Sequence, residues 1–282
     1  MSQAKNALII GASRGLGLGL VKTLLGDGWQ VTATVRNPQK AEALQALGDV
    51  RIEKLDMDDQ QAVIALSQKL KGETFDLLFV NAGVKGPADQ TPGGATLAEV
   101  GQLFFTNAVA PINLAQRFVE QIRPDSGVLA FMSSVLGSVT MPDAPELALY
   151  KASKAALNSM TNSFVTQLGD TTLTVLSLHP GWVKTDMGGE GADIDVDTSV
   201  RGLVDQVKAY TGKGGHHFVN YKGETSITVL SLHPGWVKTD MGGEGADIDV
   251  ETSTRGLVDQ VNAYVGKGGH HFINYRGETI PW

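Results

Sequence analysis

The chain contains no cysteine among its 282 residues, which excludes disulfide bonds, catalytic thiols and cysteine-ligated metals. Positive charge is also scarce, since 23 Lys and Arg against 30 Asp and Glu give a formal net charge of -7. Surfaces that bind nucleic acid or anionic lipid need clustered Lys and Arg, so we expect neither partner. No apolar run approaches membrane-spanning length, and the N-terminal residues show no signal-peptide pattern. We therefore expect a globular cytoplasmic protein without a membrane partner.

The strongest pattern along the chain is an internal repeat. Residues 173–225 and 227–279 align at an offset of 54, and only seven of the 53 aligned positions differ. Two copies are too few for a solenoid, so the pattern indicates one duplicated βαβ unit. Without one copy, 282 − 54 = 228 residues remain, the size of a single compact α/β domain. We expect residues 1–225 to form this domain with the first copy, and residues 226–282 to be a surplus second copy that extends a sheet edge or forms an interface.

Strand and helix patterns alternate through the first 225 residues. This alternation predicts an α/β fold, a Rossmann-type doubly wound parallel sheet with helices on both faces. The segments that predict strands are 7–10, 30–35, 50–55, 76–80, 127–132, 173–178 and 217–221. The segments that predict helices are 16–25, 39–47, 60–70, 97–122, 150–168 and 199–210.

A glycine-rich turn follows the first predicted strand and leads directly into a helix. It reads Gly11-Ala12-Ser13-Arg14-Gly15-Leu16-Gly17. Glycines let the backbone turn tightly and approach a pyrophosphate, and the free N–H groups of the helix N-terminus favour an anion. The position at the first strand-to-helix junction favours a dinucleotide site over a plain tight turn.

The end of the second predicted strand decides between the two nicotinamide cofactors. Proteins that bind NAD carry an acidic residue there for the ribose hydroxyls, but this segment reads Thr34-Val35-Arg36-Asn37. A guanidinium matches the geometry of the 2′-phosphate of NADP, and Arg36 and Arg14 can both supply one. Either arginine alone would be an ordinary solvated cation, so NADP(H) is predicted from the two together with the missing carboxylate.

Tyr150 and Lys154 lie four residues apart at the start of a predicted helix, which places them on one helical face. A free tyrosine has a pKa of about 10. To exchange protons near neutral pH its phenolate needs a nearby positive charge, which Lys154 can supply. The pair is therefore the candidate for proton transfer.

At these residues the chain resembles the short-chain dehydrogenase/reductase family, whose catalytic signature is Tyr-x-x-x-Lys. Other motifs of that family match in order: the glycine-rich turn, Asn81-Ala82-Gly83, Asn107, Ser133-Ser134-x-x-Gly137 and Pro180-Gly181-Trp182-Val183-x-Thr185. Within the family the chain is most similar to C-factor-like and sniffer-like carbonyl reductases. The resemblance covers the 228-residue unit and implies an enzyme that uses NADP(H) to reduce a small aldehyde or ketone to an alcohol.

The resemblance also implies roles for individual residues. Tyr150 would protonate the carbonyl oxygen, and Ser134 would hydrogen-bond the same oxygen. Lys154 would lower the pKa of Tyr150 and hold the nicotinamide ribose, while Asn107 would position Lys154 and a proton-relay water. The cofactor contacts would come from Gly11, Ser13, Arg14, Gly15, Leu16, Gly17, Arg36, Asp56, Met57, Asn81, Ala82, Gly83, Tyr150, Lys154, Pro180, Gly181, Val183 and Thr185.

Two of these assignments leave alternatives open. Ser133 and Ser138 lie close to Ser134, which is chosen from the Ser-Ser-x-x-Gly register. Asp56, at the end of the third strand, is placed near the adenine, with helix capping as the alternative.

Both copies of the repeat carry the Pro-Gly-Trp-Val-Lys-Thr loop, but the sheet has one place for the last two strands. Seating the second copy would require closing an inserted loop of 54 residues, which costs roughly 3 to 4 kcal/mol. We therefore predict that the loop of the first copy contacts the cofactor and that residues 234–239 do not. A mixed seating, in which the chain crosses between copies at an equivalent position, is the alternative.

The remaining expectations concern metals, assembly and competing functions. The adjacent histidines at 216–217 and 270–271 point to opposite faces of a strand, so no metal site is expected. We expect a homo-oligomer, a dimer or a tetramer. The main alternative function is a nucleotide-binding signalling or scaffold protein with little catalysis, whose second copy serves as an interaction module. A defective product of duplication is a third hypothesis, and the intact set of Tyr150, Lys154, Ser134 and Asn107 favours the enzyme.

Overall fold

The computed structural model describes residues 4–139, 141–169, 171–224, 228–265, 267 and 269–280. The chain divides into two compact units, Met1–Glu224 and Thr225–Trp282. Among the helices of the described segments, none combines the length and the apolar character needed to cross a membrane.

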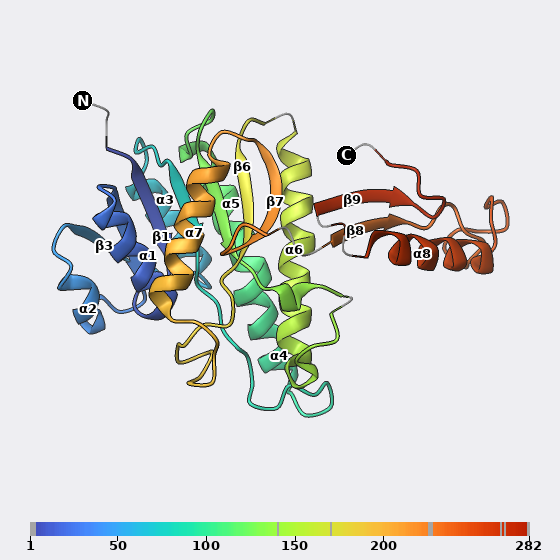
Figure 1. The fold of residues 1–282 in the computed structure, drawn as a ribbon, viewed down its shortest axis with the longest axis horizontal. Coiled ribbons are helices and arrows are strands. Elements are labelled where there is room, and N and C mark those ends of the chain that lie inside the picture. The colour runs from blue at the N-terminus through green and yellow to red at the C-terminus, as the bar shows by residue number, and fades with distance from the viewer. Residues whose placement is uncertain are drawn as a thin grey trace. The chain divides into compact units, whose positions relative to one another are not determined.

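The first unit is built on a parallel seven-stranded sheet in the order β3-β2-β1-β4-β5-β6-β7 (Figure 1). The strands are β1 (Asn6–Ile10), β2 (Gln30–Val35), β3 (Val50–Lys54), β4 (Leu77–Val80), β5 (Val128–Met132), β6 (Thr174–His179) and β7 (Gly215–Asn220). Every residue of β4 and β5 is buried, because helices cover both faces of the central strands. The strand order reverses between β1 and β4, and the carboxyl ends beside such a switch point form the ligand crevice of open α/β sheets.

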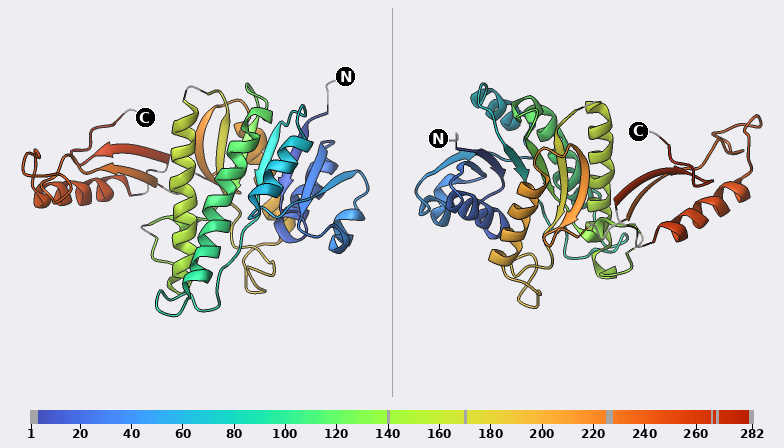
Figure 2. Two further views of the ribbon diagram at one scale, coloured as in Figure 1. Left: turned by 180° about the vertical axis from the view of Figure 1, so that it is seen from behind. Right: turned by 45° about the horizontal axis from the view of Figure 1, so that its top comes forward.

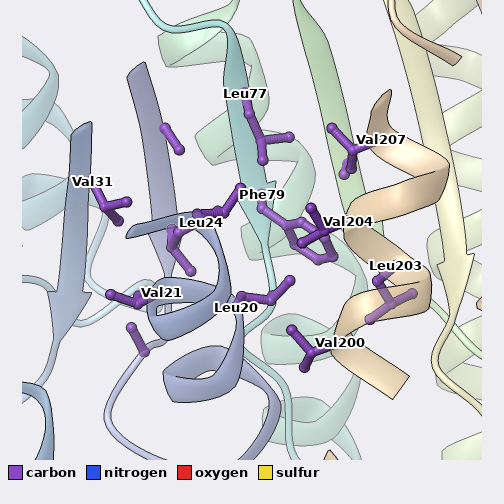
Figure 3. Close-up of a cluster of buried hydrophobic side chains, with 14 of the residues drawn as sticks. Leu20, Val21, Leu24, Val31, Leu77, Phe79, Val200, Leu203, Val204 and Val207 are labelled. Atoms are coloured by element: carbon purple, nitrogen blue, oxygen red, sulfur yellow. The ribbon is translucent and has the colours of Figure 1, made fainter. Parts of the chain in front are cut away.

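Helices cover both faces of this sheet. On one face, α1 (Gly15–Gly26) and α7 (Val196–Tyr210) pack their apolar side chains against the central strands (Figure 3). On the other face lie α3 (Gln60–Lys69), α5 (Ala110–Phe118) and α6 (Ala148–Leu168) (Figure 2, left). The shorter elements are α2 (Glu42–Gln45), α4 (Leu97–Phe104) and the single turns η1 (Pro38–Lys40), η3 (Val119–Gln121), η4 (Val135–Gly137) and η5 (Pro145–Leu147). This architecture confirms the predicted Rossmann-type sheet.

Two predicted helices differ from those observed. The segment predicted as one helix at 97–122 is interrupted by a π-helix, η2 (Phe105–Val109), which separates α4 from α5. The helix predicted at 39–47 is reduced to η1 and α2, because Ala41 leaves helical geometry with φ −107° and ψ 43°. The spacing of apolar residues shows which face of such a segment is buried. A local departure from α-helical geometry rotates this face only slightly, so the spacing does not reveal it.

The last two strands of the sheet come from the first copy of the repeat. β6 pairs with β5 on one side and with β7 on the other. Lys208 on α7 donates to Asp27 at 2.7 Å, a contact that Asn262, the equivalent residue of the second copy, is too short and uncharged to reproduce. Val200 of α7 is fully buried, where the second copy has Thr254. These two side chains are better suited to this place than their equivalents in the second copy.

The second unit has the same elements as the first copy in a smaller structure. β8 (Thr228–His233) and β9 (Gly269–Asn274) pair in parallel, and α8 (Val250–Tyr264) connects them. The loop after β8 also repeats the first copy in detail: the indole Nε1 of Trp236 donates to the Gly242 carbonyl, as that of Trp182 does to the Gly188 carbonyl, both at 2.8 Å.

Candidate active site

The glycine-rich turn lies at the switch point of the sheet, against the end of β4. Gly11 has a φ of +83°, and a Cβ on it would lie 2.7 Å from that of Ala82. The Asn81 side-chain amide donates to the Gly11 carbonyl at 2.7 Å. A Cβ on Gly17 would come within 2.1 Å of that same carbonyl oxygen. Close backbone contacts therefore require glycine at 11 and 17, and the Asn81-Ala82-Gly83 motif holds the turn in place.

The N-terminus of α1 lacks the side-chain cap that α3, α4 and α7 have. Arg14, its N-cap residue, makes no capping hydrogen bond with its side chain, whereas Asp59, Thr96 and Asp195 cap α3, α4 and α7. The first N–H groups of a helix have no intrahelical partner, and they carry the positive end of the helix dipole. The geometry of the turn and the start of α1 therefore fits a phosphate group.

The two arginines predicted to select NADP(H) lie at the surface. Arg14 Nη1 is 2.5 Å from Asp186 Oδ2, and the two side chains are 74% and 75% exposed. An ion pair this exposed contributes about 0 to 1 kcal/mol, so a phosphate could replace Asp186 at little cost. Arg36 is exposed directly after β2. Asp186 was not predicted from the sequence, because its contact with Arg14 joins residues 172 positions apart.

Asp56 and Met57 follow β3. Asp56 is exposed and accepts a hydrogen bond from the Asp58 backbone N–H at 3.1 Å, while Met57 is buried. The cap of α3 is Asp59, whose carboxylate accepts from two backbone N–H groups of the first turn. Helix capping by Asp56 is therefore wrong, and its place beside the adenine stays a prediction.

Tyr150 and Lys154 lie in the first turns of α6, where the end of β5 supplies their partners. Ser134 lies close enough to the Tyr150 hydroxyl to lower its pKa. Lys154 Nζ donates to the Met132 carbonyl at 2.9 Å and lies 5.8 Å from the centre of the Tyr150 ring. Ser133 instead donates to the Asn158 side chain at 2.6 Å. The structure thus brings Ser134 to the tyrosine and turns Ser133 away from it.

Burial changes the acidity of both groups. It raises the pKa of Tyr150 to about 12, which is opposite to the lowering expected from Lys154, and Ser134 counteracts this rise in part. Burial lowers the pKa of Lys154 to about 8. At neutral pH a neutral phenol therefore lies beside a mostly protonated amine. These are the protonation states that proton donation by the tyrosine requires.

Asn107 is fully buried in the π-helix η2. Its Oδ1 accepts from the Val84 backbone N–H at 2.8 Å, and its Nδ2 donates to the Val84 carbonyl at 2.8 Å and to Ser153 Oγ at 3.0 Å. Ser153 in turn donates to the Tyr150 carbonyl at 2.7 Å. The side chain of Asn107 therefore joins the segment after β4 to the start of α6.

Gln90 is a buried residue of the site that the sequence did not single out. Its Oε1 accepts from the Tyr150 backbone N–H at 2.9 Å, and its Nε2 donates to the carbonyls of Lys85 and Pro87. It thus fixes the position of the first turn of α6. A lone glutamine in a loop is usually exposed, so its residue type gave no reason to expect Gln90 in the site.

The loop of the first copy reaches the glycine-rich turn. A Cβ on Gly15 would lie 3.5 Å from Thr185 Cγ2. Gly181 has a φ of +85°, and the Pro180 carbonyl accepts from Ser199 Oγ on α7 at 2.6 Å. Val183 is buried. The loop therefore brings Thr185 to the same end of the sheet as Gly15.

The first histidine pair makes contacts on both sides of β7. His216 is hydrogen-bonded to Ser177 and Asn162, whereas His217 is bonded to the Gly214 carbonyl and lies against Tyr210. Within the part of the chain that the structure describes, no group of three or more His, Asp or Glu side chains could hold a metal ion.

A Rossmann-type sheet with an open glycine-rich turn at its switch point and a tyrosine–lysine pair at the same end defines a nucleotide-dependent oxidoreductase. The model of the short chain dehydrogenase family matches residues 5–194. The chain belongs to this family.

Three relatives illustrate the similarity. A carbonyl reductase from Pseudomonas aeruginosa PAO1 in complex with NADP is 38% identical, with a TM-score of 0.74, and the match covers 79% of this chain and 98% of that one. The carbonyl reductase Sniffer of D. melanogaster is 33% identical, with a TM-score of 0.70 and coverages of 78% and 98%. The C-signal protein of Myxococcus xanthus is 32% identical over 151 residues, which are 52% of this chain and 89% of that protein. These findings confirm the predicted family.

Proposed function

We propose that this protein is an NADP(H)-dependent carbonyl reductase that converts an aldehyde or ketone to an alcohol. The observation that carries the proposal is that two groups act beside Tyr150: Ser134, which lowers the pKa of its hydroxyl, and Lys154, whose Nζ lies 5.8 Å from the centre of its ring. The NADP-bound carbonyl reductase of similar fold supports both the cofactor and the reaction.

The chain offers a distinct group for each part of the cofactor. The N–H groups at the start of α1 would hold the pyrophosphate, and Arg14 and Arg36 would hold the 2′-phosphate. No carboxylate follows β2 to repel that phosphate. When bound, NADPH supplies the hydride that reduces the carbonyl carbon.

Tyr150 supplies the proton in this proposal. Its hydroxyl donates to the carbonyl oxygen as the alcohol forms, and Ser134 donates a second hydrogen bond that orients this oxygen. A tyrosine with a pKa of about 12 is protonated at neutral pH, so it is ready to act as the acid. The charge of Lys154 stabilises the phenolate that remains. Reduction is therefore the direction that the resting protonation states favour.

The test is a fluorescence titration with NADPH and NADH, followed by turnover assays over a panel of aldehydes and ketones. We expect NADPH to bind in preference to NADH and at least one class of carbonyl compound to be reduced. Tyr150→Phe should keep NADPH binding and lose about 100- to 10,000-fold in kcat, the usual contribution of a general acid.

Tyr264→Phe, in the second copy, removes a hydroxyl of the same kind far along the chain and should leave turnover unchanged. Retained turnover in Tyr150→Phe would refute the proton-donor role. Failure of the wild-type chain to bind either cofactor would refute the reductase function itself.

A further inference from the structure

The two arginines of the candidate cofactor site come from neighbouring strand ends. Arg14 follows β1 in the glycine-rich turn, and Arg36 follows β2 directly. These strands are paired in parallel, and the backbone N–H of Gly11 donates to the Thr34 hydroxyl of β2 at 3.1 Å. Both arginine side chains therefore start from the edge of the sheet at which the proposed NADP(H) site lies.

Arg14 has an acidic partner, whereas Arg36 has no ion pair with any residue that the structure describes. Arg14 Nη1 donates to Asp186 Oδ2, which comes from the loop after β6. A carboxylate and a phosphate accept hydrogen bonds from the same guanidinium N–H groups. Asp186 and a 2′-phosphate are therefore rivals for Arg14, while Arg36 remains available.

Asp186 lies in a turn that is held by its own hydrogen bonds. The Gly188 backbone N–H donates to Thr185 Oγ1 at 3.1 Å. The second copy forms the same bond at 3.0 Å between the residues 54 positions later, although Asp240, the equivalent of Asp186, has no ion pair within the described part of the chain. The turn therefore forms without an arginine partner. Loss of the ion pair should change the freedom of the Arg14 side chain rather than the shape of the loop.

We propose that Asp186 competes with the 2′-phosphate of NADP(H) for Arg14, and so sets how strongly the site prefers the phosphorylated cofactor. The inference rests on the proposed function, because it needs an NADP(H) site at the glycine-rich turn. The carboxylate holds the guanidinium, and the 2′-phosphate has to displace it. NADH lacks that phosphate and meets no such competition. Asp186 therefore lowers the affinity for NADPH and leaves the affinity for NADH unchanged.

The exposure of the ion pair limits the size of this effect. Both side chains are about three-quarters exposed, and ion pairs of this kind are weak and screened by salt. A phosphate monoester carries more negative charge than a carboxylate, so it can displace Asp186. The competition should therefore reduce the affinity by about two- to fivefold rather than block the site, and high salt should diminish the difference.

The first test is a fluorescence titration of the full chain with NADPH and NADH. We expect Asp186→Asn to bind NADPH about two- to fivefold more tightly than the wild type and to bind NADH equally well. Calorimetry with 2′,5′-ADP and 5′-AMP, which differ only in the 2′-phosphate, should show the same contrast. Asp240→Asn is the matched control, since it removes the same charge from the equivalent turn of the second copy and should change neither affinity.

A double-mutant cycle tests whether the effect passes through Arg14. In an Arg14→Gln background, Asp186→Asn should leave the NADPH affinity nearly unchanged, because no guanidinium remains to compete for. An equal gain in that background, or weaker binding of both cofactors by Asp186→Asn, would overturn the competition. Unchanged NADPH affinity in Asp186→Asn, with a wild-type chain that binds NADPH, would overturn this inference alone. A wild-type chain that binds neither cofactor would refute the proposed function and this inference with it.

Discussion

Lys154 carries its positive charge in the protein interior, where burial disfavours the charged form. Its side chain is buried at the start of α6, and its ammonium group donates to a neutral acceptor, the Met132 carbonyl. Burial lowers its pKa to about 8, against about 10.4 for a free lysine. The charge that would stabilise the Tyr150 phenolate is therefore lost at a pH where most lysines keep theirs.

This pKa leads to a prediction for the pH dependence of reduction. Lys154 loses its proton as pH rises through about 8, while Tyr150, with a pKa of about 12, keeps its own. We expect kcat/KM to be flat between pH 6 and 7 and then to fall by about tenfold per pH unit well above 8. The measurement is a kcat/KM profile, which reports the groups of the free enzyme. A profile that stays flat to pH 10, with the fold intact by circular dichroism, would show that the Lys154 charge is not required.

Residues close in sequence were easier to predict than residues brought together by the fold. The spacing of Tyr150 and Lys154 on one helix needed only the geometry of a helical turn. Gln90 contacts the site from a distant segment, and nothing in its local sequence indicates that contact. Asp186 follows Thr185 in the loop predicted to contact the cofactor, but the motif did not indicate its pairing with Arg14. Ser134 is an intermediate case. The motif placed it at the end of β5, but it did not establish which of the neighbouring hydroxyls would face the tyrosine.

At the scale of elements, the alternation of apolar runs sufficed to predict the strands to within one or two residues. The π-helix η2 was not predictable, although it holds Asn107 against Val84 and Ser153. One extra residue in a helical turn changes the hydrogen bonds without changing which side chains are apolar. Such a bulge is often found at a functional site, and this one contains a residue of the family signature.

The equivalent helices α7 and α8 allow a paired prediction of stability. Val200→Thr puts a hydroxyl into the buried contact between α7 and α1, and we expect it to lower the free energy of unfolding by about 1 to 2 kcal/mol. Thr254→Val, the reverse change at the exposed position of α8, should alter it by less than about 0.5 kcal/mol. Urea titrations followed by circular dichroism measure both. Equal effects would mean that the two positions share the same environment.

At the scale of the whole molecule, the first unit contains the complete seven-stranded sheet. We therefore expect a chain that lacks residues 226–282 to keep its fold and to bind NADPH within about twofold of the full chain. A tenfold loss of affinity would correspond to a change of about 1.4 kcal/mol in the binding free energy. Thermal melting and an NADPH titration of the truncated chain measure this. Unfolding of the truncated chain would show that the second copy contributes to the core.

The near-identity of the two copies also has a consequence in time. A ribosome adds roughly 5 to 20 residues per second, so the second copy emerges about 3 to 11 seconds after its counterpart at the 54-residue offset. During that interval the first copy is the only strand pair that can add to β5. We therefore expect a newly made chain to add the first copy to the sheet before the second copy has been synthesised, whereas a chain refolding from denaturant has both copies present from the start.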